Sequence, residues 1–294
     1  MNLGCVIATL ATAAGSAQTT ARLVKDLNPE NARSPLKVQQ AVMAGGKAFF
    51  NASTLEHGAE LWVSGGKPAD TRRIADLYPG YRSSSPDAMM EMGGTLYFSA
   101  DDGIHGRELW RSDGSPAGTF RLGDYFPGGG DSHPRALAAS SDRLWFTAET
   151  GKGTALWCSD GTPAGTVELN PTAAGSFARQ FTAPTVFTRW GEHFYFCSGS
   201  ELWKSDGTVE GTLRLDDLRT MPNFGLNIPE MKVVGDSLYL VVNTAGRRWL
   251  WRSNGEAGGA ELVPREPGFF IPATRIPPSA SSGQATAASR ARCR

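Results

Sequence analysis

The sequence predicts an all-β protein, a β-propeller of four-stranded blades, and three observations lead to this fold. A tryptophan-centred motif recurs, with its tryptophans at positions 62, 110, 157, 203 and 251, which are 46 to 48 residues apart. A period of this length is typical of repeat architectures. Each repeat contains four short runs of β-forming residues separated by turns, which is the content of one propeller blade. The 35 glycines and 18 prolines suit many short strands and disfavour a helical protein.

Residues 1–18 have some features of a secretory signal peptide. Residues 3–17 are apolar and small, a plausible cleavage site precedes Gln18, and the run is too short to span a bilayer. A basic segment before the apolar run is missing, so a frayed N-terminus is the alternative interpretation. A signal peptide would place the protein outside the cytoplasm, as a secreted or cell-envelope protein.

The first strand candidate, residues 22–27, matches the ends of later repeats and not their starts. It resembles residues 73–77 and 121–125, which each close a repeat and precede a proline. We therefore expect an orphan outer strand from a blade whose earlier strands are absent.

The second repeat shows the four strands of a blade most clearly. They are expected at residues 88–92, 95–100, 108–111 and 119–122, with a tight hairpin at Asp113-Gly114 because both residue types tolerate positive φ. The other copies align with this one. The alignment predicts five complete blades, at residues 33–80, 81–130, 131–175, 176–222 and 223–264.

A sixth repeat begins after the fifth but is not completed. The repeat region extends over residues 20–276, whereas residues 277–294 lack strand signal and apolar content and are expected to be a disordered tail. Because a propeller usually pairs its N-terminal outer strand with C-terminal inner strands, the ring is expected to remain open. A truncated or frame-shifted copy of a protein with at least six blades would explain this pattern, and resequencing the codons for residues 270–294 would test it.

The motif itself resembles a known family. Glu201-Leu202-Trp203-Lys204-Ser205-Asp206-Gly207-Thr208-Val209-Glu210-Gly211-Thr212, and with one change the segment Glu108 to Thr119, resemble the ELWxxDGTxxGT repeat of bacterial proteins. Other copies depart from the motif at Gly65, Ala155, Trp249 and Asn254. The resemblance implies an exported β-propeller-like repeat protein and no particular reaction.

The recurring side chains of the motif are interpreted as structural. A large apolar residue at one place in every repeat favours packing between blades over ligand stacking. The recurring aspartate is expected to cap backbone amides of the turn. These structural positions are Trp62, Trp110, Trp157, Trp203, Trp251, Asp113, Asp160 and Asp206.

Candidate ligand-binding residues come from loops that share one face of the propeller. In a four-stranded blade, the loop between strands two and three and the connection from strand four to the next blade lie on the same face. Candidates on this face are Asp76, Asp101, Asp102, His105, Asp124, Asp131 and His133, with His57 beside them. The register also predicts an acidic ring of Asp26, Asp76, Asp124 and Asp217. A cation, a sugar or a basic protein could bind there; the alternative is solvated loop carboxylates and turn caps.

Other chemistry finds no support in the sequence. Twenty-nine basic residues balance 29 acidic ones, so nucleic-acid binding is not predicted. No catalytic or phosphate-binding motif occurs, no metal site or cofactor is predicted, and one aspartate per turn supplies too few oxygens for Ca²⁺. A disulfide between Cys158 and Cys197 is conceivable in an oxidising compartment, but sequence cannot establish its geometry.

These observations favour a non-enzymatic exported repeat protein that acts as an interaction or scaffold module for a protein or glycan. Two alternatives stay open. One is a propeller-type polysaccharide hydrolase or lyase, which would need carboxylates that converge from several blades. The other is a truncated non-functional copy, motivated by the broken sixth repeat.

Overall fold

The computed structural model describes residues 40–169, 186–218, 227–244 and 247–264. The expected signal segment, the orphan strand at residues 22–27, the start of the sixth repeat and the C-terminal tail lie outside these ranges. The described part is almost entirely β-structure, and its only helical element is the short 3₁₀ helix η1 at Pro68–Asp70. No helix within the described ranges is long and apolar enough to cross a membrane.

The strands form five four-stranded antiparallel sheets, one for each predicted repeat. In every sheet the strands follow chain order from the inner to the outer edge. Blade 1 consists of β1 (Ala41–Ala44), β2 (Lys47–Thr54), β3 (Gly58–Ser64) and β4 (Arg72–Arg73). Blade 2 consists of β5 (Asp87–Met92), β6 (Thr95–Asp101), β7 (Arg107–Ser112) and β8 (Phe120–Arg121). Blade 3 consists of β9 (Arg135–Ala139), β10 (Leu144–Thr150), β11 (Gly153–Ser159) and β12 (Thr166–Glu168).

The last two blades have the same organisation. Blade 4 consists of β13 (Phe187–Trp190), β14 (His193–Ser198), β15 (Glu201–Ser205) and β16 (Leu213–Asp217). Blade 5 consists of β17 (Asn227–Val234), β18 (Ser237–Thr244), β19 (Arg247–Ser253) and β20 (Ala260–Leu262). The predicted β-propeller blade, repeated five times, is therefore the observed fold.

The outer strands of blades 1 and 2 are shorter than the sequence suggests. The strand expected at residues 119–122 is only the two-residue β8, and residues 74–77 of the similar segment in blade 1 follow β4 without strand structure. The chain still makes one more backbone hydrogen bond to strand three at each place, from Ile74 to Leu61 and from Leu122 to Leu109. It then turns away to build the connection to the next blade.

Apolar side chains on both faces of each sheet bind the blades together. Strands buried on both faces carry continuous apolar runs, as in the middle strands of these blades. One core cluster joins Phe49 and Leu61 of blade 1 to Phe98 and Trp110 of blade 2. Equivalent clusters join blades 2 and 3, blades 3 and 4, and blades 4 and 5. The motif tryptophan of one blade thus packs against the preceding blade.

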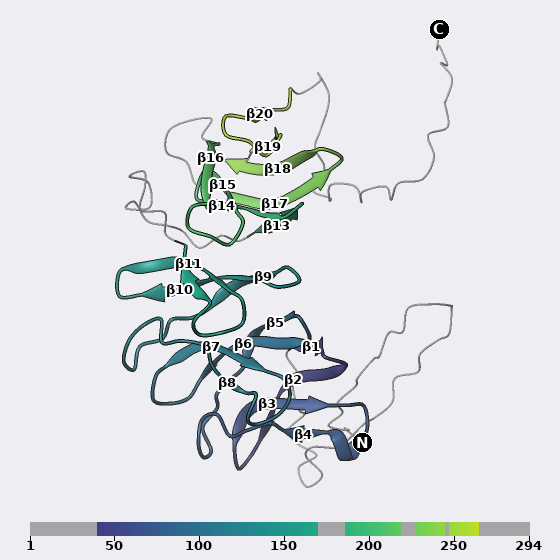
Figure 1. Cartoon of the computed structure of the whole chain (residues 1–294), viewed down its shortest axis with the longest axis vertical. Helices are drawn as coiled ribbons and strands as arrows, with labels where there is room; N and C mark the ends of the chain where they lie inside the picture. The colour runs from purple at the N-terminus through teal and green to yellow at the C-terminus, as the bar shows by residue number, and fades with distance from the viewer. Residues whose placement is uncertain (1–39, 170–185, 219–226, 245–246, 265–294) are drawn as a thin grey trace, which may run out of the picture.

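The blades follow one another in chain order, and blade 1 and blade 5 lie at opposite ends of the long axis of the molecule (Figure 1). The innermost strands of neighbouring blades contact each other, as β1 does with β5, β5 with β9 and β13 with β17. The described strands therefore form an arc of blades with two ends.

The Ser-Asp-Gly-Thr segment forms the hairpin between strands three and four. In blade 2, Oδ1 of Asp113 accepts hydrogen bonds from the amide and hydroxyl of Ser115, both at 2.7 Å. Oδ1 atoms of Asp160 and Asp206 accept the same pair of bonds from Thr162 and Thr208. These hydrogen bonds lower the pKa of Asp113 and stabilise the turn.

Blade 1 departs from the motif by exchanging two residues. Its turn has Gly65 where blades 2, 3 and 4 have aspartate and blade 5 has Asn254, and it has Asp70 where the other blades have glycine. In blade 2 these places are held by Asp113 and Gly118, whose side chain and backbone lie close together. An added Cβ at Gly65 would lie 3.1 Å from Oδ2 of Asp70. In blade 1 the Asp70 side chain therefore occupies the space that the Asp113 side chain occupies in blade 2, but it reaches this space from the opposite end of the turn.

Candidate functional site

The candidate ligand-binding residues lie on what we call the loop face, residues 54–58, 74–86, 101–106 and 122–134 of blades 1 and 2 and of the connections that follow them. The antiparallel order of each sheet brings the loop between strands two and three to the same end as the connection to the next blade. The two kinds of loop touch, because a Cβ added to Gly103 would lie 2.6 Å from the ring of Tyr78. The loop face is thus a continuous surface.

The aspartates of the predicted ring carry basic partners. Asp76 pairs with Arg73 at 3.0 Å and with Nδ1 of His57 at 3.1 Å. Asp124 pairs with Arg121 at 3.4 Å, and the corresponding pair in blade 4 joins Asp217 to Arg214 at 3.5 Å. Each pair joins residues three apart at the end of an outer strand. Asp26, the remaining member of the predicted ring, lies outside the described residues.

Asp101, Asp102 and His105 organise their own loop. Oδ1 of Asp101 accepts a hydrogen bond from the amide of Gly103 at 2.7 Å. Oδ1 of Asp102 accepts from the amide of His105 at 2.7 Å, while its Oδ2 lies 2.7 Å from Nδ1 of the same histidine. Partial burial of Asp102 acts to raise its pKa, but the hydrogen bonds from His105 prevail and lower it. These groups stabilise a compact turn.

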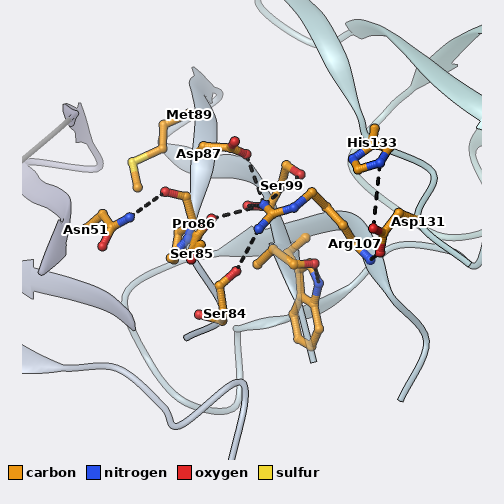
Figure 2. Close-up of polar contacts among 12 residues, drawn as sticks. Asn51, Ser84, Ser85, Pro86, Asp87, Met89, Ser99, Arg107, Asp131 and His133 are labelled. Atoms are coloured by element: carbon orange, nitrogen blue, oxygen red, sulfur yellow. Dashed lines mark hydrogen bonds and ion pairs between the residues drawn. The ribbon is translucent and has the colours of Figure 1, made fainter. Parts of the chain in front are cut away.

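Asp131 and His133 belong to the connection between blades 2 and 3. Oδ1 of Asp131 accepts a hydrogen bond from the amide of Arg107 at 2.7 Å, as Oγ of Ser83 does from Ala59 one blade earlier. Nε2 of His133 lies 3.6 Å from Oδ2 of Asp131 (Figure 2). The structure therefore places all seven predicted residues on one face, where each carboxylate has a hydrogen-bond or ionic partner within the fold.

No group of three or more metal-ligating side chains occurs within the described residues. Cys158 and Cys197, for which a disulfide is conceivable from the sequence, are both buried and not bridged. Burial raises the pKa of the Cys158 thiol to about 11, so this sulfur is unreactive at neutral pH.

The glutamate of the repeat motif has a role that sequence reasoning missed. Glu108 is fully buried, and its Oε2 accepts hydrogen bonds from Oγ of Ser132 at 2.6 Å and from the amide of Tyr125 at 3.2 Å. Glu60 is also fully buried and accepts from Oγ of Ser84 at 2.7 Å and from the amides of Ser84 and Leu77 at 3.1 Å. Each carboxyl group thus links strand three to the connection between two blades by hydrogen bonds, and these bonds stabilise the conformation of the loop face.

The titration of Glu108 should be visible in the stability of the protein. Burial raises the pKa of Glu108 from 4.5 to about 7, and the bonds from Ser132 and Tyr125 only partly offset this. The folded state therefore binds this proton more tightly than the unfolded state, so the stabilising contribution is complete below pH 4.5 and is lost as pH rises through about 7. We expect Glu108→Gln to flatten the fall in unfolding free energy over this window, measured by urea denaturation at a series of pH values. Glu56→Gln, at an exposed position, should leave the fall unchanged; an equal slope for Glu108→Gln and the wild type would contradict the assignment.

Arg107 fixes the loop face where blades 1 and 2 meet. Its Nη1 donates to the carbonyl oxygen of Ser85 at 3.0 Å and pairs with Asp87 at 3.2 Å, while Nη2 donates to the carbonyl oxygen of Ser84 at 3.3 Å (Figure 2). Ser85 has a φ of 46°, which few residues other than glycine adopt. Blade 1 has Ala59 at the position of Arg107, so this contact distinguishes the two copies.

Large apolar side chains project from the loop face. Leu55 is 78% exposed, Tyr81 is 77% exposed and Ile104 is 72% exposed. They come from the loop of blade 1, the connection to blade 2 and the loop of blade 2, respectively. The three exposed apolar groups therefore share the loop face.

Comparison with known proteins shows similarity only at the level of the fold. No protein-family model matches the chain, and no curated protein matches it in sequence. Oligopeptidase B from Leishmania major is 11% identical with a TM-score of 0.50, and the match covers 84% of this chain and 36% of that chain. A prolyl endopeptidase is 14% identical with a TM-score of 0.49, over 86% and 38% of the two chains. A putative TolB from Agrobacterium tumefaciens is 11% identical with a TM-score of 0.41, over 83% of both chains.

The chain spans little more than a third of the length of the two peptidases that it matches. At these identities the likeness concerns the fold alone, which agrees with the five four-stranded sheets. The chain has a β-propeller fold.

Proposed function

We propose that this chain is an exported, non-enzymatic binding scaffold that recognises its ligand, a protein, through the loop face of blades 1 and 2. The observation that carries the proposal is the exposure of Leu55, Tyr81 and Ile104 on loops whose connections are anchored by buried hydrogen bonds. Burying such side chains against a partner releases water from apolar surface, which favours association. Export is proposed from the signal-like composition of residues 3–17.

The rigidity of the loops supports binding without a large ordering cost. Buried Glu60 and Glu108 hold the connections, and Arg107 holds the junction between them. A surface that is ordered before association loses little conformational entropy when the partner binds. The charged groups around it already have partners, which suits a polar rim around an apolar centre.

Two substitutions on the loop face should weaken binding without destabilising the fold. We expect Tyr81→Ser with Ile104→Ser to raise the dissociation constant for the partner by about tenfold or more, because central apolar contacts carry much of the binding energy of an interface. The partner is first identified by capture from an envelope extract on immobilised wild-type chain, and its affinity is then measured by calorimetry.

A matched control removes two exposed apolar groups elsewhere. Leu213→Ser with Leu262→Ser lies on the outer strands of blades 4 and 5 and should leave binding unchanged. Unchanged affinity in the Tyr81 and Ile104 variant would contradict the proposed surface. Turnover of a polysaccharide in a parallel glycan assay would contradict the non-enzymatic assignment.

A further inference from the structure

The same joint occurs wherever two described blades meet. The hairpin between strands three and four of each later blade rests on the preceding blade, through a glycine of positive φ. Those glycines are Gly114, Gly161, Gly207 and Gly255, with φ of 89°, 90°, 90° and 81°. All four are buried. The turn of one blade is therefore seated on its neighbour at four successive junctions.

The surface of the preceding blade that receives the turn is here called the seat. It consists of an aromatic residue of strand two and the cross-strand partner of that residue in strand three. In blade 2 these residues are Tyr97 and Arg111, and Nη1 of Arg111 donates to the carbonyl oxygen of Gly161 at 2.8 Å. In blade 4 they are Tyr195 and Lys204, and Nζ of Lys204 donates to the carbonyl oxygen of Gly255 at 3.4 Å. In these two blades the joint combines a close backbone contact with a charge-assisted hydrogen bond.

Blade 5 carries this seat, but no described blade follows it. Tyr239 and Arg252 are cross-strand partners, as Tyr97 and Arg111 are in blade 2. Tyr239 is partly exposed and the Arg252 side chain is 50% exposed, whereas Tyr97 is only 2% exposed. Leu250 of the motif is also partly exposed, although its four equivalents Leu61, Leu109, Leu156 and Leu202 are 0% exposed. The side of blade 5 that faces away from blade 4 is thus an apolar seat. Turns pack on the equivalent seats of blades 1 to 4, but no described turn packs on this one.

Blade 1 carries the complementary turn. Gly66 has a φ of 92°, and its amide donates to Oγ of Ser64 at 3.1 Å, as the amide of Gly161 does to Oγ of Ser159 at 3.0 Å. Among the five turn glycines, Gly66 alone is not buried. The turn of blade 1 thus has the conformation of the turns that pack on a preceding blade, but no described blade precedes blade 1.

We infer that a second copy of this chain fills the seat, so that the turn of blade 1 in one copy docks on Tyr239, Leu250 and Arg252 of blade 5 in the next. Blade 1 and blade 5 lie at opposite ends of the molecule, so the contact forms between copies (Figure 1). Arg252 would donate to the carbonyl oxygen of Gly66, as Arg111 does to that of Gly161. Glu261 of β20 occupies the position that Arg72 occupies in β4, where Arg72 binds the turn of blade 2. In the contact between copies, Glu261 would face Lys67, which lies next to the turn of blade 1. Such a head-to-tail contact is heterologous and can continue from copy to copy.

Blocking each end separately tests the inference. Gly66→Val places a side chain where the seated glycines meet the aromatic ring, and Arg252→Glu removes the donor and repels Glu261. Gly46→Val is the matched control, because Gly46 also has positive φ, at 73°, but an added Cβ meets nothing within 4 Å. All chains are full length, and thermal unfolding confirms that each variant is folded.

We expect the wild-type chain to sediment with a mass that rises with concentration above the 31.4 kDa of one copy. Arg252→Glu should raise the dissociation constant by about tenfold or more, the effect of losing a charge-assisted hydrogen bond, and Gly66→Val should raise it by a similar factor through overpacking of the contact, whereas Gly46→Val should associate like the wild type. A mixture of the two blocked variants should form dimers and nothing larger, because one copy supplies a free seat and the other a free turn. A wild-type mass of one copy at all concentrations overturns the inference. A mixture that forms no dimers overturns it as well.

Discussion

Replacing Glu108 with alanine should lower the free energy of unfolding by about 2–4 kcal/mol, because buried donors lose their acceptor. Glu108 is fully buried and receives bonds from Ser132 and from the amide of Tyr125. In Glu108→Ala the amide of Tyr125 would remain in an apolar interior without its acceptor, Oγ of Ser132 would keep only its bond to the carbonyl oxygen of Arg107, and the side-chain volume would be lost too. The loss should appear in urea unfolding at neutral pH.

Two further variants show whether the hydrogen bonds cause that loss. Glu56→Ala removes a glutamate that is 86% exposed and should change stability by no more than about 0.5 kcal/mol. Ser132→Ala removes one of the donors and should cost about 0.5–2 kcal/mol, less than the loss of the carboxyl group. If Glu108→Ala proved as stable as Glu56→Ala, the connection between blades 2 and 3 would not depend on this carboxyl group.

The fold could be predicted because the repeat imposes the same pattern five times. A single copy, such as residues 144–159, is ambiguous, but five aligned copies of two apolar runs around a turn indicate four-stranded blades. The outer strands were expected to be longer because residues such as Ile74 and Leu122 have strand-forming side chains. In the structure these side chains are buried under the connections, which compete with strand pairing.

The candidate face could be predicted from topology, but the roles of its charged residues could not. Chain order alone places His57 and Asp76 at the same end of blade 1. The sequence does not reveal that Arg73 lies beside Asp76, because this pairing depends on how the chain bends after β4. The charge of an exposed aspartate therefore indicates a ligand only after its internal partners are known.

The role of the motif glutamate left a signal that sequence reasoning overlooked. Glu60 and Glu108 are each followed 24 residues later by a serine, Ser84 or Ser132, in a Ser-X-Pro segment. The copy with Ala155 in place of glutamate has arginine 24 residues later. The copy with Glu201 has Gly225 at that place, so only the first two copies carry the pair. In both of them the pair is joined by the hydrogen bond from serine to glutamate.

The repeated turn joins the blades, so a side chain added to a turn that packs against the neighbouring blade should lower the free energy of unfolding more than one added to an open turn. An added Cβ at Gly207 would lie 2.9 Å from Sγ of Cys158 and 3.2 Å from the ring of Trp145. Trp145 is 1% exposed, lies 4.4 Å from the ring of Phe194 and donates from Nε1 to Oγ of Ser205 at 3.2 Å. It cannot move aside without disrupting the joint between blades 3 and 4.

Gly46 provides the comparison, because it has a similar φ and open space around it. We expect Gly46→Val to cost about 1–3 kcal/mol for backbone strain alone. Gly207→Val should cost the same strain and about 1–3 kcal/mol more for overpacking the joint. The difference between the two unfolding free energies, measured by urea denaturation under identical conditions, is therefore the most direct test. A clearly larger loss in Gly207→Val supports the turn as the joint between blades, and equal losses in the two variants would contradict it.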